Sequence, residues 1–424
     1  MRPHPAWLPT GDQQALLEAC LAADDDAARA AFAAWRRQVD IERLDFGSYR
    51  LLPLLWKRMV ALGLDHPSRN VIKGVYRRTW VGNHLVLARA ADVVRLLAAE
   101  GIPAMLVKGA ALTLRNYRDE GVRPMDDVDL AVPRGAARRA VDALVAGGWM
   151  PHATPLTGTR VSAAGAHAGW TAGPRPAAAF DEAYLGLRHA HGFQGPAGTD
   201  VDLHWFLFQG HGDAGGDERA WAAAQPAALQ QAPVLLPDPA DHLLLLLAHG
   251  VRWNPIPPLR WVADAVTLIR SEGTQLDWER FLAAARDRRL TLAAAGMLDY
   301  LQARFEVGAP ERIRRELRTA PVTRRERQDF ALTVSPPGIR AGLHELRWLY
   351  ERYRALRRGP AGRDLPGFPA FVRHALGAPS LTQLGLYAVS ELGRRVFGQR
   401  DRGGATRDRP PISSATAGTC SIRE

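Results

Sequence analysis

The first hundred residues repeat apolar positions at the three- and four-residue spacing of amphipathic helices. This spacing is plainest in LLPLLWKRMVALGL and VLARAADVVRLLAAEG, and the second stretch ends at Gly101, which suits a helix C-cap. An earlier stretch, ALLEACLAADDDAARAAFAAWRRQ, is rich in helix formers, and its acidic step at residues 24–26 is suited to cap a second helix. These patterns predict an N-terminal helical region over residues 1–100.

The pattern changes after residue 101, where short strand-like runs alternate with helical stretches. The residues from about 152 to 178 are rich in Gly, Ala, Thr and Pro and predict an irregular insertion. This mixture predicts an α+β unit over residues 101–235. Its expected strands are IPAMLVKG, MDDVDLAV, LGLRHAHGF and TDVDLHWFLF, and its expected helices are AALTLRNY and RGAARRAVDALVAGGW.

Helical spacing returns from LPDPADHLLLLLAHG onward and predicts a C-terminal helical domain over residues 236–399. Residues 400–424 lack apolar periodicity, so we expect a disordered tail there. The predicted fold class is therefore α+β, a mixed β-sheet core flanked by N-terminal and C-terminal helical regions. The further helices expected in the C-terminal domain are PPLRWVADAVTLIRS, LDWERFLAAARDRR, TLAAAGMLDYLQARF and AGLHELRWLYERYRAL.

The strand MDDVDLAV contains acids where a buried strand would be apolar. Asp127 and Asp129 share one face of this strand, while Val128 and Leu130 point to the other. Two carboxylates that lie so near each other repel one another, and each resists losing its hydration. We therefore expect a cation to compensate their charge. Paired acids on one strand face suit Mg²⁺, which prefers oxygen ligands. The alternative is an acidic turn at a strand start, in which one aspartate caps backbone amides.

Two further features complete the predicted site. Gly109, next to Lys108 at a strand end, would let the backbone approach a phosphate closely. In TDVDLHW, Asp202 repeats the arrangement of an acid between apolar residues, and a third carboxylate could complete a metal site and accept a proton from an attacking hydroxyl. The alternative for this second motif is an edge strand with a polar outer face. We expect His204 to line or orient the site.

Other histidine, tryptophan and arginine side chains give weaker signals. His189 and His191 are expected to be structural or solvated, since no Cys/His ladder supports a zinc site. In HGVRWNPIPPLRWVADA the Trp and Arg residues have the spacing of interhelical packing, with Arg260 as a candidate for contacting phosphate.

The composition of the chain is compatible with several kinds of binding partner. The formal net charge of +11 suits anionic partners such as nucleotides, RNA or acidic peptides, and it equally suits an Ala/Arg-rich genome. The two cysteines lie far apart in the sequence, which fits a reducing compartment. The first residues lack the apolar core of a signal peptide, and the longest apolar run is too short to span a bilayer. We expect a cytoplasmic protein with no membrane partner.

The motifs LVKGAAL, GVRPMDDVDLAV and VDLHWFL, in this order, resemble the nucleotidyltransferase superfamily that shares the DNA polymerase β catalytic fold. More narrowly, with AHGVRWNPIPPLRWVADAVTLI and LDWERFLAAA, the chain resembles a bacterial family labelled uncharacterised nucleotidyltransferase, over roughly residues 85–290. Some members of that family are encoded near genes for peptide natural products. The chain has Gly109-Ala110 where the superfamily often has Gly-Gly or Gly-Ser, and its interval from Gly109 to Asp127 is longer than in many relatives.

The resemblance implies a role for each matching residue. Asp127 and Asp129 would be the metal-binding pair and Asp202 the third carboxylate, with Mg²⁺ (or Mn²⁺) as the cofactor. Gly109 would be the phosphate-loop glycine, and Lys108 and Arg123 would contact triphosphate oxygens.

The implied activity is transfer of an NMP from an NTP to a hydroxyl of a small-molecule or peptide acceptor, releasing pyrophosphate. Two other functions remain open at this point: a non-catalytic nucleotide-binding or scaffold protein, and a basic nucleic-acid-binding protein that uses the Arg-rich C-terminal helices. The second is not favoured, because the sequence lacks the arginine-aromatic pattern of an RNA reader.

Overall fold

The structure is a computed structural model that describes residues 7–153, 175–196, 198–209, 214–336, 339–358 and 365–375, with isolated positions at 378, 380–382 and 385. Most of the expected insertion and the whole expected tail lie outside these residues. Among the described residues, no helix combines the length and the apolar character that crossing a membrane requires.

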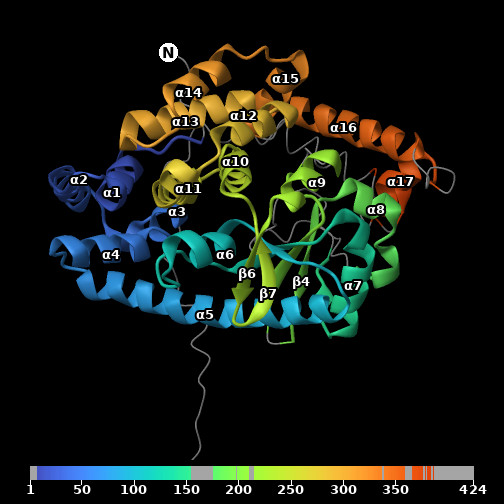
Figure 1. Ribbon diagram of the computed structural model, residues 1–424, viewed down its shortest axis with the longest axis horizontal. Coiled ribbons are helices and arrows are strands. Elements are labelled where there is room, and N and C mark those ends of the chain that lie inside the picture. Colours follow the sequence, from blue (N-terminus) through green and yellow to red (C-terminus); the bar gives the residue numbers. More distant parts are fainter. Residues whose placement is uncertain are drawn as a thin grey trace, which may run out of the picture.

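Seven strands of the described chain form one mixed sheet in the order β3-β4-β5-β2-β1-β7-β6. β2 runs parallel to β5, and β1 runs parallel to β7, whereas the other neighbours are antiparallel. Helices flank this sheet, so the predicted α+β class is confirmed (Figure 1). The strands are β1 (Met105–Leu106), β2 (Asp127–Ala131), β3 (Met150–Pro151), β4 (Ala190–Gln194), β5 (Asp200–His204), β6 (Gln225–Leu229) and β7 (Ala232–Leu236).

Helices precede, interrupt and follow the strands. The N-terminal ones are α1 (Gly11–Leu21), α2 (Asp25–Gln38), α3 (Phe46–Tyr49), α4 (Leu52–Leu62) and α5 (Arg69–Ala99). Those between strands are α6 (Lys108–Leu112), which continues into a π-helical turn (Thr113–Tyr117), α7 (Ala137–Ala146), α8 (Glu182–Leu187) and α9 (Ala214–Ala222). The C-terminal ones are α10 (Pro239–Gly250), α11 (Arg260–Glu272), α12 (Trp278–Asp287), α13 (Thr291–Phe305), α14 (Glu311–Thr319), α15 (Arg324–Thr333), α16 (Ile339–Arg358) and α17 (Phe368–Ala375).

The sheet separates two apolar cores. Val128 and Leu130 of β2 are fully buried against α5 and α7 on one side. Met105 and Ala131 belong to the second core, which the helices α10 to α13 complete on the opposite side. Because successive side chains of a strand alternate between faces, the acids between the apolar residues of β2 point toward the helices of the second core.

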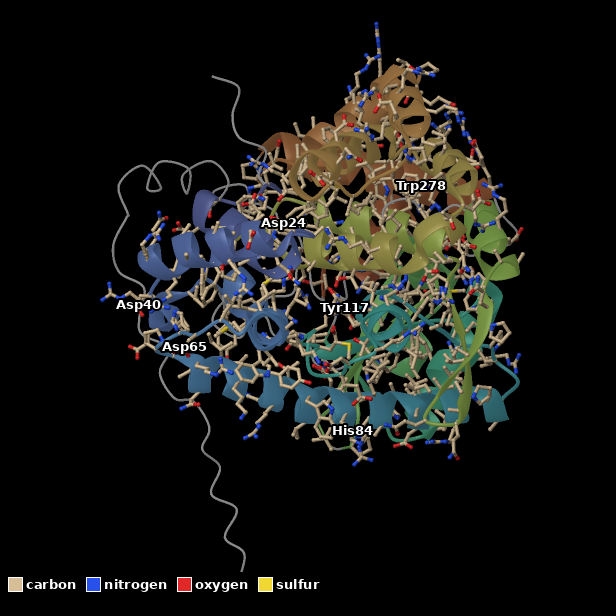
Figure 2. All side chains as sticks on the ribbon, turned by 60° about the vertical axis from the view of Figure 1, so that its left-hand side comes forward. Asp24, Asp40, Asp65, His84, Tyr117 and Trp278 are labelled. Atoms are coloured by element: carbon tan, nitrogen blue, oxygen red, sulfur yellow. The ribbon has the colours of Figure 1, made fainter. Side chains whose placement is uncertain are left out.

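Helix α5 is longer than its sequence pattern predicted. It runs 31 residues along one side of the molecule, from beneath α4 to beneath β6 and β7 (Figure 1). Gly101 follows its end with φ of 66°, the left-handed backbone that favours glycine, as the sequence led us to expect. His84 lies on its outer side, whereas Tyr117 lies near the middle of the molecule (Figure 2).

One strand prediction needs correction, and one hairpin was not predicted. The expected strand LGLRHAHGF is half helix, because Asp181 caps α8 by accepting a hydrogen bond from the Tyr184 amide, and β4 begins only at Ala190. The β6–β7 hairpin had no prediction. Its turn is Gln230-Gln231, both at positive φ, so the Asn-Gly or Asp-Gly signal of a two-residue hairpin is missing from the sequence.

A buried ion pair joins the helical region to the sheet. The guanidinium of Arg123, from the loop before β2, donates to both carboxylate oxygens of Asp264 on α11, at 2.8 and 2.9 Å. Both side chains are at most 10% exposed, and the Tyr117 hydroxyl donates to the same carboxylate at 3.0 Å. Breaking such a pair from one side leaves a buried charge without its partner.

We therefore expect Asp264→Ala to lower the free energy of unfolding by about 3–5 kcal/mol, measured by urea denaturation. Asp142→Ala is the matched control, since Asp142 forms a half-exposed pair with Arg138 within α7. The control should change stability by less than about 1 kcal/mol. Equal effects of the two substitutions would show that the buried pair does not hold α11 to the sheet.

Candidate active site

Two parallel strands in register position the acidic side chains. β2 pairs with β5 so that Asp129 lies opposite Asp202 and Asp127 lies opposite Asp200. Val128 and Val201 alternate with these acids and are fully buried on the other face of the sheet. The apolar positions therefore determine which face the acids occupy, as the alternation in the sequence predicted.

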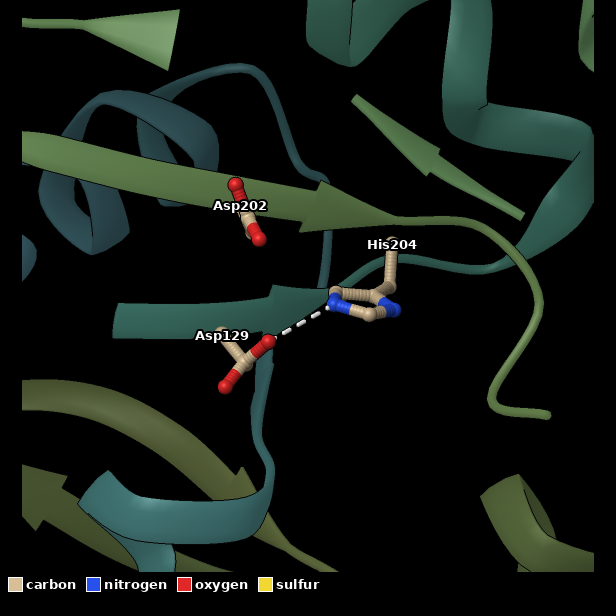
Figure 3. A group of neighbouring side chains, drawn as sticks. All are labelled: Asp129, Asp202 and His204. Carbon is tan, nitrogen blue, oxygen red and sulfur yellow. Dashed lines mark hydrogen bonds and ion pairs between the residues drawn. The ribbon is translucent and has the colours of Figure 1, made fainter. Parts of the chain in front are cut away.

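Asp129, Asp202 and His204 form one compact group (Figure 3). Each offers a ligand atom that lies within 4.8 Å of those of the other two. Within the part of the chain that the structure describes, this group does not include Asp127, which lies two residues earlier on the same face of β2. The structure thus brings together two of the three predicted acids and adds His204, which the sequence indicated only as a lining residue.

The Asp129 carboxylate accepts two strong hydrogen bonds on one oxygen. Lys108 Nζ lies 2.6 Å from Asp129 Oδ1, and His204 Nε2 lies 2.9 Å from the same atom. Burial by itself would raise the pKa of Asp129, but the charges and hydrogen bonds of Lys108 and His204 outweigh it and hold that pKa well below its ordinary value. Among the described residues, the Lys108 ammonium thus compensates the charge of Asp129.

Lys108 has an unusual backbone conformation. It opens α6 directly after β1 with φ of 52°, a left-handed value that costs a non-glycine residue free energy. Helix α10 packs against α6 and carries the buried His242, whose pKa burial lowers to about 3. The helical region thus packs against the helical turn that carries Lys108.

Gly109 packs directly against Arg123. A Cβ atom at residue 109 would overlap the Arg123 guanidinium and approach Met125 Sδ to 3.2 Å. The Arg123 guanidinium, which pairs with Asp264, therefore occupies the space that a side chain at residue 109 would need. Both predicted phosphate-binding residues lie beside the acidic group, with Arg123 in a buried ion pair and Lys108 on Asp129.

His191 and His189 have different surroundings. His191 hydrogen-bonds to the Tyr184 hydroxyl at 2.6 Å and to the His152 carbonyl at 3.0 Å, inside an aromatic cluster with Phe180. Its position is one of packing. His189 lies edge-on to His204 with ring centroids 5.4 Å apart, and burial, followed by the charge of His204, lowers its pKa well below the ordinary value. Of these two histidines, His189 is therefore the one that lies next to the acidic group.

Two basic residues of the helical region lie near the acidic group without having been predicted as site residues. His249 belongs to the last turn of α10, and Arg252 follows that helix. Burial, Lys108 and Arg252 lower the pKa of His249 while Asp129 opposes this shift, so all four groups lie within electrostatic reach of one another. Their spacing in the sequence resembles ordinary helix packing, so the pattern gave no signal that they face β2.

The residues present fit a divalent cation. Two carboxylates and one imidazole are a donor set that Mg²⁺ and Mn²⁺ accept, with oxygen donors in the majority. An ammonium group already rests on Asp129 Oδ1, which shows that this oxygen attracts a cation. Asp202 leans over Gly192 of β4, where a Cβ would lie 3.0 Å from its Oδ1, so its carboxylate is held close to the sheet.

Comparison with known proteins gives one finding. Residues 48–306 match the model of a protein family described as "Uncharacterised nucleotidyltransferase". A search of curated proteins found no match. The matched range includes β2, β5 and the helices α10 and α11 that face them.

Acidification should lower the free energy of unfolding, because burial lowers the pKa of His191 to about 3. An unfolded histidine titrates near pH 6.5, so between these two values the unfolded chain binds one more proton than the folded chain. Stability is therefore greatest above the unfolded pKa and falls as the pH decreases. The slope for this side chain approaches about 1.4 kcal/mol per pH unit.

Urea unfolding between about pH 7.5 and 5 measures this slope while most carboxylates stay ionised. His191→Gln keeps a hydrogen-bonding side chain that does not titrate in this range. The slope of its unfolding free energy against pH should therefore be smaller by up to the contribution of one bound proton, about 1.4 kcal/mol per pH unit. An unchanged slope would mean that the folded protein tolerates a charged His191.

Proposed function

The chain belongs to the uncharacterised nucleotidyltransferase family, and we propose that it moves an NMP from an NTP to a hydroxyl of a small-molecule or peptide acceptor. Pyrophosphate is the second product. Residues 101–235 supply the catalytic core in this proposal, residues 1–100 and 236–399 are helical regions around it, and residues 400–424 are a tail. The observation that supports it best is the group of Asp129, Asp202 and His204 on two parallel strands, with Lys108 and Gly109 beside it.

Each acidic residue has a role in the proposal. Asp127, Asp129 and Asp202 hold Mg²⁺, or alternatively Mn²⁺. The bound cation supplies charge neutralisation at the triphosphate and orients the reacting oxygens. Asp202 accepts the proton of the acceptor hydroxyl. The acceptor oxygen then forms its bond to the α-phosphorus as the bond to the β-phosphate oxygen breaks, and pyrophosphate leaves with that electron pair.

The basic residues act on the triphosphate. Lys108 leaves Asp129 and pairs with phosphate oxygens once the nucleotide is bound, since a fixed ammonium compensates the charge that develops on the leaving group. Gly109 lets the backbone approach the phosphates. Arg123 contributes its positive charge from behind Gly109, where Asp264 holds it.

A role as a nucleic-acid reader finds less support. The arginines of α14 are largely engaged with acids of the same region: Arg312 with Glu316, Arg314 with Glu311, and Arg318 with Asp299. Charges that are matched locally attract a phosphate backbone weakly. A small or peptidic acceptor agrees better with this balance of charges.

Asp129→Asn should reduce pyrophosphate release by about 100-fold or more, because the neutral amide removes the charge that holds the cation. Pyrophosphate release from each of the four NTPs, with a small-molecule and peptide extract as the source of acceptor, measures the effect. Asp142→Asn is the matched control and should behave as the wild type, since Asp142 lies on the outer surface of α7. Wild-type turnover by the Asp129 variant would reject the proposed role.

Lys108→Met should strengthen the binding of Mn²⁺ without nucleotide and weaken the binding of NTP. The ammonium on Asp129 Oδ1 competes with a metal ion, so its removal should raise Mn²⁺ affinity about tenfold, within the range of coupling between two ligands. Electron paramagnetic resonance of free Mn²⁺ measures this affinity. Lys57→Met is the control, because Lys57 pairs with Asp119 at 2.9 Å and does not contact the acidic group. Unchanged Mn²⁺ affinity in the Lys108 variant would mean that the ammonium and the ion do not share the oxygen.

A further inference from the structure

The cations around the acidic group differ in what neutralises them. Lys108 pairs with Asp129, and Arg123 pairs with Asp264. Arg50, which precedes α4, lies 3.0 Å from the Asp126 carboxylate. Each of these three side chains thus has a carboxylate of the chain as its partner.

Arg252 and Arg260 have neutral partners instead. Arg252 donates to the side chain of Gln209 and, at 3.1 Å, to its carbonyl. Arg260 donates to the Pro124 carbonyl at 3.0 Å. Across the residues that the structure describes, no carboxylate lies within ion-pair distance of either guanidinium. Asp264 and Asp126 act on Arg260 only from beyond that distance, so neither guanidinium has the direct ion pair that its neighbours have.

Burial makes this arrangement costly. It lowers the pKa of Arg252 to about 10, and burial with the nearby Arg123 and Arg50 lowers that of Arg260 to about 9. Both side chains are partly buried, and a partly buried cation that bonds only to carbonyl and amide oxygens does not recover all the hydration that it loses. An anion from outside the chain would restore the balance, and uncompensated charge of this kind concentrates at binding sites.

Both arginines lie beside the two strands of the acidic group. They bracket the segment between α10 and α11, and Pro124 lies three residues before Asp127 whereas Gln209 lies five residues after His204. Both arginines and Asp129 influence the pKa of His249, so all three charges lie within electrostatic reach of this histidine. Arg260 is also the first residue of α11, whose positive end no side chain caps.

We propose that Arg252 and Arg260 form a subsite for a phosphate-like oxyanion, beside the acidic group and His249. The planar guanidinium matches phosphate oxygens in pairs, which suits this ligand better than a halide or a neutral group. The subsite deepens the proposed nucleotidyl transfer and rests on it for its biological ligand. The oxyanion is either the triphosphate of the nucleotide or an anionic group of the acceptor.

Calorimetric titration with inorganic tripolyphosphate, without divalent metal, tests the subsite in the full chain. The wild type should bind this probe, and Arg252→Met/Arg260→Met should weaken binding by roughly tenfold or more for each charge removed. Arg138→Met is the control, since Arg138 is a half-exposed surface arginine of α7. Two further measurements separate loss of binding from loss of fold. One is the titration of Arg252→Met alone, which keeps the Arg260 bond to the Pro124 loop, and the other is a melting curve of each variant.

Failure of tripolyphosphate to bind the wild type, or equal binding by the folded double variant, would overturn the subsite. NTP binding in Mg²⁺ then distinguishes the two sources of the anion. Weaker NTP binding by the double variant identifies the triphosphate, and unchanged NTP binding identifies the acceptor. A different result would reject the proposed nucleotidyl transfer, namely that the wild type does not bind NTP in the presence of Mg²⁺. The metal-free titration with tripolyphosphate does not depend on that result.

Discussion

The parallel pairing of β2 with β5 is the constraint on which the rest of the site depends. A register that sets Asp129 beside Asp202 places two carboxylates on adjacent strands of a partly buried face. Their mutual repulsion and lost hydration have to be offset, and Lys108 and His204 do so at Asp129 with bonds of 2.6 and 2.9 Å. A shift of one residue would turn the acids into the apolar core and Val128 toward the helices.

The helical region takes part in building the site. Asp264 on α11 holds Arg123, and Arg123 fills the space over Gly109, so the backbone of the loop depends on a helix more than a hundred residues later. Helix α10 packs against α6, which Lys108 begins in a left-handed backbone conformation. Arg252 and Arg260 add positive charge from the two ends of the segment that joins these two helices. Contacts such as the Arg123–Asp264 ion pair therefore cross the predicted boundary at residue 236.

The sequence predicted the elements whose patterns are local. The alternation in MDDVDLAV and TDVDLHW predicted two strands with their acids on one face, and β2 and β5 agree with it. Apolar spacing predicted α11, α12 and α13 within a few residues. The β6–β7 hairpin escaped prediction because both glutamines of its turn adopt positive φ without the usual glycine. LGLRHAHGF was wrong in its first half because the side-chain cap at Asp181 favours a helix that the alternation does not show.

By itself, the sequence determined which acids share a strand face, the class of fold and the resemblance to nucleotidyltransferases. These follow from side-chain alternation and from motifs in a fixed order, which are properties of neighbouring residues. Only the tertiary structure decided that β5 lies beside β2 in register, that Lys108 neutralises Asp129, and that Asp264 holds Arg123. It also decided that Arg252 and Arg260 lack carboxylate partners among the described residues. The reason is physical: the electrostatic balance of a charge depends on what lies within a few ångströms in space, and residues that are far apart in the chain supply those neighbours.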